Sequence, residues 1–316
     1  MKFIVTIDLE EDNWKNFPAE HYTISNINEI PELQQLFDQF GIRPTYLITY
    51  QVAANPTAVH VLKPILESGR AEIGAHCHPW NTPPFEEQVT RESTMLCNLP
   101  AELQFRKIRS LTELVENNFG IRPVSFRAGR WGYSETVGKN LRELGYRVDT
   151  SITPYTDWSS LSGPDFSSVP LRSYWSVGDL LQVPATVGFL QSNFAVANRI
   201  LRAIRNSPFD AMRISGALGT IKLLNRVNLS PELDNDREMA KLTKLLMKKG
   251  FHCVNLFFHS PSLVAGLTPF VNDEWERRKF IERLRRYFSF VTSAGLEPVT
   301  LREFADGVER EARATA

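Results

Sequence analysis

Two pairs of side chains suited to metal binding occur at i, i+2 spacing in the first quarter of the chain. Asp8 and Glu10 lie in "VTIDLEEDNW", directly after an apolar run, and His76 and His78 lie in "EIGAHCHPW", after another. In an extended backbone, residues i and i+2 point to the same side, so each pair can converge on one point. Two imidazoles and a carboxylate form a divalent-metal site with a position left open for water. The alternative interpretations are a capping or solvated acidic turn before the next helix and a pair of partly exposed loop histidines.

Two further candidates follow apolar runs later in the chain. Arg127, in "SFRAGRWG", could hold a catalytic carboxylate in place through a bidentate pair, whereas an ordinary surface arginine is the alternative, above all for Arg130. His259 closes "VNLFFH" and has an ordinary pKa near neutrality, so it suits protonation of a leaving group; the alternative is a hydrogen-bonded core histidine. The sequence has no G-x-S-x-G elbow, Walker loop or dinucleotide glycine motif, which argues against serine hydrolases and nucleotide-binding folds.

Short runs rich in β-branched and aromatic residues position these candidates and alternate with helical patterns. Strands are predicted at 2–8, 43–49, 71–76, 123–129, 147–152, 180–186, 253–259 and 296–301. Helices are predicted at 30–40, 57–68, 101–118, 134–144 and 237–249. This alternation indicates parallel βα units, in a barrel or a doubly wound sheet, with functional groups at the C-terminal ends of the strands.

Composition restricts the class of protein. The 316 residues carry 36 basic and 36 acidic side chains, so no net field draws the chain to nucleic acid, and no nucleic-acid partner is expected. Three cysteines without C-x-x-C spacing favour a reducing compartment. The opening apolar run is too short for a signal peptide, so we expect a cytoplasmic protein. No repeat, low-complexity tract or glycine-serine linker divides the sequence, which favours a single domain over residues 1–316. Nothing in the sequence indicates an oligomeric state.

Two irregular segments interrupt the alternation. Residues 155–170 are rich in Ser, Pro and Gly and predict a long loop, which in a compact domain is often functional. Residues 193–231 predict an inserted helical lobe with a basic face formed by Arg199, Arg202, Arg205, Arg213, Lys222 and Arg226. That face is either a solvated helix surface or a surface for lipid or an anionic substrate, which would permit peripheral membrane contact.

Taken in order, these motifs resemble those of the polysaccharide deacetylase (NodB-homology) family, from Phe3 to about Phe304. The resemblance implies a distorted (β/α) barrel of seven or eight strands, with 193–231 as an insertion. In "TIDLEED", Asp8 matches the family's catalytic base and Glu10 its metal-binding carboxylate, although the family commonly has two adjacent aspartates followed by glycine. The family usually spaces its two histidines four apart, which here leads from His76 to Trp80; "HCHPW" therefore resembles a branch in which His78 is the second ligand.

The remaining motifs supply the supporting roles. "FRAGRWG" resembles the motif whose arginine orients the base, so Arg127 takes that role, and "RVDTS" makes Asp149 the acid that buttresses the site. "FFHSPSL" gives His259 the role of protonating the departing amine. Glu11 and Asp12 remain as substitute ligands or as caps of the next helix.

The resemblance implies a metal-dependent hydrolase, with Zn²⁺ as the expected ion, that removes an acyl group, expected to be acetyl, from an N-acylated sugar. For a cytoplasmic member we expect a lipid- or nucleotide-linked glycan precursor. One alternative is a deformylase or an allantoinase-like amidase. Another is an inactive member that binds a glycan or a partner enzyme. Trp80, Trp131, Trp158 and Trp175 are candidates for lining a sugar site or for packing on the barrel rim.

Overall fold

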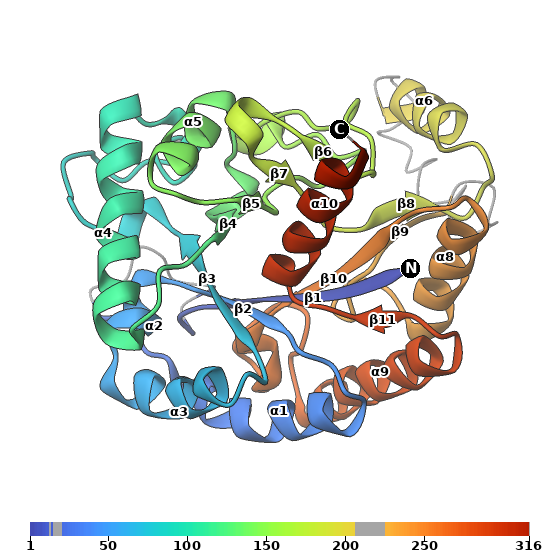
Figure 1. The fold of residues 1–316 in the computed structure, drawn as a ribbon, viewed down its shortest axis with the longest axis horizontal. Helices are drawn as coiled ribbons and strands as arrows, with labels where there is room; N and C mark the ends of the chain where they lie inside the picture. Colours follow the sequence, from blue (N-terminus) through green and yellow to red (C-terminus); the bar gives the residue numbers. More distant parts are fainter. Residues whose placement is uncertain (13, 15–20, 206–224, 316) are drawn as a thin grey trace.

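The central feature of the fold is a curled, mainly parallel sheet surrounded by helices (Figure 1). The structure is a computed structural model of residues 1–316, and it describes all of them except 13, 15–20, 206–224 and 316. In the main sheet, neighbouring strands follow the order β10-β1-β2-β3-β4-β5-β7-β6, with β11 paired to β1. Only β6 pairs in antiparallel fashion within that sheet, over the part of the chain that is described.

The strands are β1 (Lys2–Leu9), β2 (Thr45–Ile48), β3 (Glu72–Cys77), β4 (Ser125–Ala128), β5 (Val148–Asp149), β6 (Tyr174–Trp175), β7 (Leu181–Gln182), β8 (Val187–Phe189), β9 (Arg226–Asn228), β10 (Cys253–His259) and β11 (Glu297–Pro298). The helices are α1 (Ile30–Gln39), α2 (Tyr50–Ala54), α3 (Pro56–Glu67), α4 (Ala101–Phe119), α5 (Glu135–Glu143), α6 (Phe194–Arg205), α8 (Asp236–Lys248), α9 (Glu274–Ser293) and α10 (Leu301–Thr315). Among the described residues, no helix combines the length and the apolar character that a membrane crossing requires.

An irregular segment completes the curled sheet into a distorted barrel. After β7, the N–H groups of Val183 and Ala185 donate to carbonyl groups of the chain around β5. The chain then crosses to β10, where Thr186 and Asn255 are joined by a backbone hydrogen bond of 3.1 Å. The predicted distorted (β/α) barrel is therefore confirmed. Two of its strands, β5 and β7, have two residues each and are therefore shorter than the sequence suggests, whereas β10 has the predicted bounds.

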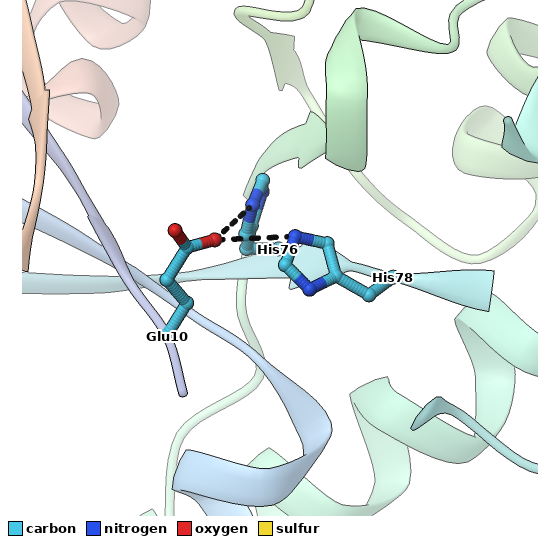
Figure 2. A group of neighbouring side chains, drawn as sticks. All are labelled: Glu10, His76 and His78. Carbon is cyan, nitrogen blue, oxygen red and sulfur yellow. Dashed lines mark ion pairs between the residues drawn. The ribbon is translucent and has the colours of Figure 1, made fainter. Parts of the chain in front are cut away.

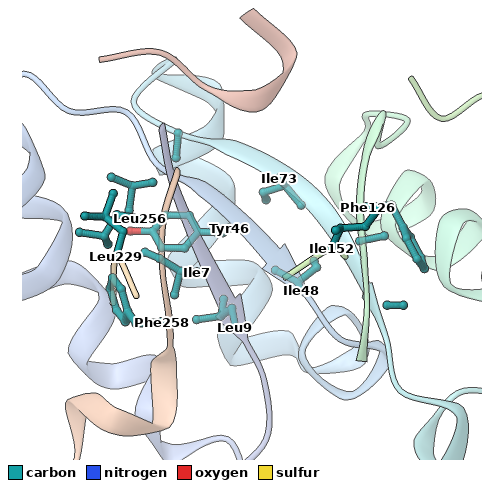
Figure 3. Close-up of a cluster of buried hydrophobic side chains, with 14 of the residues drawn as sticks. Ile7, Leu9, Tyr46, Ile48, Ile73, Phe126, Ile152, Leu229, Leu256 and Phe258 are labelled. Carbon is teal, nitrogen blue, oxygen red and sulfur yellow. The ribbon is translucent and has the colours of Figure 1, made fainter. Parts of the chain in front are cut away.

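Alternation along β1 explains how one strand serves both the core and the site. Phe3, Val5, Ile7 and Leu9 face outward into the main hydrophobic cluster, part of which Figure 3 shows. The intervening residues face the barrel interior, since side chains alternate across a strand. From the start of β1 to its C-terminal end, these inward-facing residues are Ile4, Thr6 and Asp8.

Helix α10 fills the end of the barrel where the parallel strands begin. Leu301, Phe304 and Ala305 form a separate buried cluster with Ile4 of β1 and with residues of β5 and β7. Burying this apolar surface stabilises the fold and leaves the opposite end, at the C-terminal ends of the strands, as the open one.

The two irregular segments contain local structure. Within 155–170, a bridge joins Asp157 to Asp165 and a short 3-10 helix covers Ser159–Leu161. Within 193–231, α6 is helical and β9 forms an antiparallel pair with β8. The remainder of that segment, including Arg213 and Lys222, lies mostly outside the described residues.

Candidate active site

A cavity of about 600 Å³ opens at the C-terminal ends of β1, β3, β4 and β10. Its walls combine acidic, imidazole and guanidinium groups with a large aromatic surface. The residues that line it are Asp8, Glu10, Glu11, Trp14, His76, His78, Trp80, Met95, Arg127, Ala128, Arg130, Trp131, Thr153, Trp158, Leu161, Arg226, Asn228, Glu232, Leu233, Phe257, His259 and Phe270.

Glu10, His76 and His78 converge at the floor of this cavity (Figure 2). Glu10 Oε2 lies 3.5 Å from His76 Nε2 and 3.2 Å from His78 Nε2, and all three side chains are buried. One ligand atom from each residue lies within 4.8 Å of the others, a spacing compatible with a shared metal ion. The i, i+2 spacing of the histidines at the end of β3 places both rings on one side of that strand, as the sequence predicts.

The other ring nitrogen of each histidine is held by a partner on the protein. His76 Nδ1 donates to the backbone carbonyl of Arg127 at 3.1 Å, and His78 Nδ1 donates to Glu11 Oε1 at 2.9 Å. A neutral histidine with Nδ1 protonated presents the lone pair of Nε2, so both rings offer a ligand atom toward Glu10. Glu11 is thus neither the cap nor the substitute ligand considered from the sequence; it orients His78.

The charges of the cluster favour a bound cation. Burial raises the pKa of Glu10, but hydrogen bonds from His76 and His78 and the charge of His259 outweigh it and hold that pKa well below its usual range. Burial alone would lower the pKa of His78, whereas the charges and hydrogen bonds of Glu11 and Glu10 raise it to about 10. The same negative charge that stabilises a proton on His78 would stabilise a divalent ion in its place.

Glycine at position 129 lets the His78 ring occupy this place. A Cβ at Gly129 would lie 2.3 Å from His78 Cδ2, well inside van der Waals contact. The glycine that follows β4 in "FRAGRWG" is therefore required by the approach of the ring to the backbone.

Asp8 is held by Arg127 beside this cluster. Arg127 Nη1 donates to Asp8 Oδ1 at 2.6 Å, and Arg127 Nη2 donates to Thr6 Oγ1 at 2.7 Å. Both charged side chains are nearly inaccessible to solvent. The other carboxylate oxygen, Asp8 Oδ2, faces His76 Nε2 at 3.9 Å and His259 Nε2 at 3.6 Å.

His259 has a carboxylate partner that was not identified from the sequence. Its Nδ1 donates to Glu232 Oε2 at 2.9 Å, and its backbone N–H donates to Glu232 Oε1 at 3.2 Å. Burial alone would lower the pKa of His259, but the charge and hydrogen bond of Glu232, with the charges of Glu10 and Asp8, raise it to about 9. A protonated His259 at neutral pH follows from this arrangement.

The other predicted acidic residues lie away from the metal cluster. Asp12 caps the 3-10 helix η1 (Ser25–Glu29), because its carboxylate accepts from the N–H groups of Ser25 and Asn26. Asp149 is fully buried and does not line the cavity; its carboxylate accepts from Ser151 N and Oγ, and burial raises its pKa to about 7. Its neighbour Thr150 is the residue that contacts Arg127.

Tryptophans form much of the cavity wall. Trp80, which occupies the position of a ligand in the commoner spacing, stacks on His78 with ring centroids 4.2 Å apart. Trp131 and Trp158 also line the cavity, whereas Trp175 is exposed and does not. Trp14 was not identified from the sequence; its Nε1 donates to Glu10 Oε1, and its ring lies 4.6 Å from that of His259.

Comparisons with known proteins support the fold. No protein-family model and no curated protein matches the sequence. A candidate polysaccharide deacetylase from Mycobacterium smegmatis has a similar structure, with a TM-score of 0.58 and 14% identity over 98% of this chain and 91% of that one. The Puue allantoinase has a TM-score of 0.54 and 12% identity over 96% of this chain and 89% of that one. A 4-alpha-glucanotransferase from Thermococcus litoralis has a TM-score of 0.52 and 15% identity over 97% of this chain, but over only 40% of its own length.

The chain therefore has the barrel fold found in polysaccharide deacetylases and in allantoinase, and the resemblance read from the motifs is confirmed at the level of the fold. Because the names of the three similar proteins denote different reactions, the shared fold does not select one. The side chains of the cavity, and not the fold, determine which reaction this protein can catalyse.

Proposed function

We propose that this chain is a metal-dependent amide hydrolase that removes an N-acyl group, expected to be acetyl, from a sugar. One observation carries the proposal: a Glu-His-His cluster lies beside an aspartate held by arginine and a histidine held by glutamate. Amide hydrolysis needs an activated water, a base that accepts its proton and an acid that protonates the amine, and these groups could supply all three.

Glu10, His76 and His78 are the residues that would hold the metal. Their donor set, two imidazole nitrogens and one carboxylate oxygen, suits Zn²⁺, and the hydrogen bonds at both Nδ1 atoms leave Nε2 for the ion. When bound, such an ion supplies Lewis acidity that lowers the pKa of a water molecule and polarises a carbonyl group.

Asp8 is the proposed base. Arg127 binds Oδ1, so Oδ2 remains directed toward the metal cluster, where it can accept a proton from the attacking water. The guanidinium compensates the buried carboxylate charge and fixes its orientation through contacts with Thr6 and Thr150.

His259 is the proposed acid. Its Nδ1–H donates to Glu232, and the charges of Glu232, Glu10 and Asp8 raise the pKa of the ring to about 9 against the effect of burial, so Nε2 carries a transferable proton at neutral pH. That proton is positioned on the cavity side, next to Asp8, where the departing amine would receive it.

The cavity supports a sugar as the substrate. Its tryptophans offer flat apolar faces against which a pyranose ring can pack, and its volume lies within the range of small-molecule sites. A lipid- or nucleotide-linked precursor remains our proposal for the carrier, as does peripheral membrane contact. Arg199 and Arg202 on α6 would serve that contact. Arg226, predicted on the same basic face, lies instead in β9 and lines the cavity.

Product analysis tests the reaction. The zinc-loaded protein is incubated with N-acetylated and N-formylated sugars and with allantoin, and released acetate, formate and ureide product are measured separately. Acetate from the first substrate, absent in an Asp8→Asn variant, is expected. Release of formate or of the ureide product alone would show that the protein is a different C–N hydrolase and not a deacetylase. If the zinc-loaded protein releases no product, an inactive binding protein is favoured.

A further inference from the structure

A lysine with no solvent exposure lies behind the loop that follows His78. Lys107 belongs to α4 and occupies its apolar stripe, four residues after Leu103 and four before Leu111. Burying an ammonium group is costly unless its charge and all its N–H groups find partners. The partners of Lys107 therefore indicate what the residue does.

Among the residues that the structure describes, the partners of the Lys107 ammonium all belong to one short stretch of chain. Nζ donates to the backbone carbonyls of Pro79, Thr82 and Pro84 at 2.9, 2.8 and 2.7 Å, and it pairs with Glu87 Oε1 at 2.8 Å. An ammonium has three N–H donors, so three carbonyl groups satisfy it. The stretch contains one short 3-10 helix, Pro79–Asn81, and is rich in proline, which has no N–H group to donate. The three carbonyl groups bound by Lys107 add to the few backbone hydrogen bonds that hold it.

The same stretch carries two residues that contact the metal cluster. Trp80 stacks on the His78 ring, with 21° between the two planes. Asn81 Nδ2 donates to Glu11 Oε1, the atom that also accepts from His78 Nδ1. Both residues lie between the carbonyl groups of Pro79 and Thr82, which Lys107 binds.

We propose that Lys107 is a positioning residue for the metal centre: it fixes residues 79–84 so that Trp80 and Asn81 hold His78 in its ligating orientation. The inference rests on the proposed function, because its main readout is metal affinity. Contacts that orient a ligand typically change metal affinity by about 10- to 100-fold when they are lost. The ordering of the His78 ring by Lys107 should also be visible without metal.

The test uses two variants and a matched control. Lys107→Met removes the ammonium, and Lys107→Met/Glu87→Gln also removes the carboxylate that would otherwise lose its partner. Tyr146→Phe is the control, since Tyr146 makes a buried hydrogen bond to Thr112 on the same helix, outside the loop. Zinc affinity is measured by calorimetry on metal-free protein, and the ring protons of His78 are followed by NMR, where stacking on Trp80 shifts them upfield.

Both Lys107 variants are expected to bind zinc at least about 10-fold more weakly and to lose the upfield shift, while Tyr146→Phe retains both properties. Wild-type affinity and an unchanged shift in the double variant would overturn the inference. If the wild type itself binds no zinc, the proposed function fails, and the NMR shift alone then decides the role of Lys107. Should Lys107→Met not fold, Lys107→Gln, which keeps an amide donor, is measured in the same way.

Discussion

Asp8 and His259 are register partners in the adjacent parallel strands β1 and β10, and their facing atoms, Oδ2 and Nε2, lie 3.6 Å apart. Each has its own partner at its other polar atom: Arg127 binds Asp8 Oδ1, and Glu232 binds His259 Nδ1. A proton acceptor and a proton donor are thus fixed side by side by strand pairing, next to the cluster of Glu10 and the two histidines. The proposed mechanism depends on keeping these two roles separate.

Asp8→Asn should abolish turnover while leaving zinc binding intact. Asparagine keeps the shape of the side chain but cannot accept the proton of the attacking water, and loss of a general base typically lowers the rate by about 10²- to 10⁴-fold. Acetate release and zinc content are measured on the same preparation. Activity close to wild type would exclude Asp8 as the base.

Glu232→Gln should move the alkaline limb of the pH–activity profile to lower pH. Glu232, with smaller contributions from Glu10 and Asp8, raises the pKa of His259 to about 9 against the effect of burial, so His259 loses its proton as pH rises through that value. Without the carboxylate the pKa falls, and the acid form is lost nearer neutrality. The profile of kcat/KM is compared with that of Glu297→Gln, an exposed carboxylate on β11 paired with Lys2. If wild type, Glu232→Gln and Glu297→Gln have identical alkaline limbs, His259 is not the acid that protonates the amine.

Glu11→Gln should weaken zinc binding without removing a ligand. The charge of Glu11 makes His78 a more basic ligand, and its hydrogen bond fixes the ring, so we expect a loss of about 10-fold or more in affinity. Calorimetric titration at a fixed pH measures it, with Glu86→Gln, an exposed glutamate paired with Arg106, as the control. Equal affinities in the two variants would contradict the orienting role.

Arg127→Met should destabilise the metal-free protein strongly. It leaves the buried Asp8 carboxylate without its counter-ion, and breaking a buried ion pair from one side typically costs about 3–5 kcal/mol. The double variant Asp8→Asn/Arg127→Met, which removes both charges, should be more stable than the single variant. Urea denaturation followed by circular dichroism gives the free energies of unfolding; a double variant less stable than Arg127→Met would argue against this pairing.

Much of the site was predictable because it depends on alternation within single strands. Asp8 points into the barrel because it lies four residues after Ile4, and alternate residues of β1 share one face. His76 and His78 share one side of β3 in the same way. These relationships are local, and so a sequence displays them.

Residues that act across the fold were harder to find. Glu232 reaches His259 only because the chain after β9 runs beside β10, and its sequence context, "SPELDN", does not distinguish it from other surface acids. Lys107 did leave a signal, a lysine on the apolar stripe of a helix, but its partners lie in an irregular loop that no periodicity describes. Asp149 lies in the predicted strand; its carboxylate accepts from Ser151, whose Oγ in turn accepts from the N–H of Ala128 beside Arg127, and its buttressing role stays a prediction. The proposed substrate carrier and the expected cytoplasmic location stay predictions.

The metal centre is the central claim, and elemental analysis tests it most directly. Wild type, His78→Ala and His60→Ala are purified without chelator, supplied with zinc and freed of excess ion; His60 is an exposed histidine outside the cavity and serves as the matched control. About one zinc per chain is expected in wild type and in His60→Ala, with a large loss in His78→Ala. Wild type without bound zinc, or His78→Ala with a full complement, would contradict a site built from Glu10, His76 and His78.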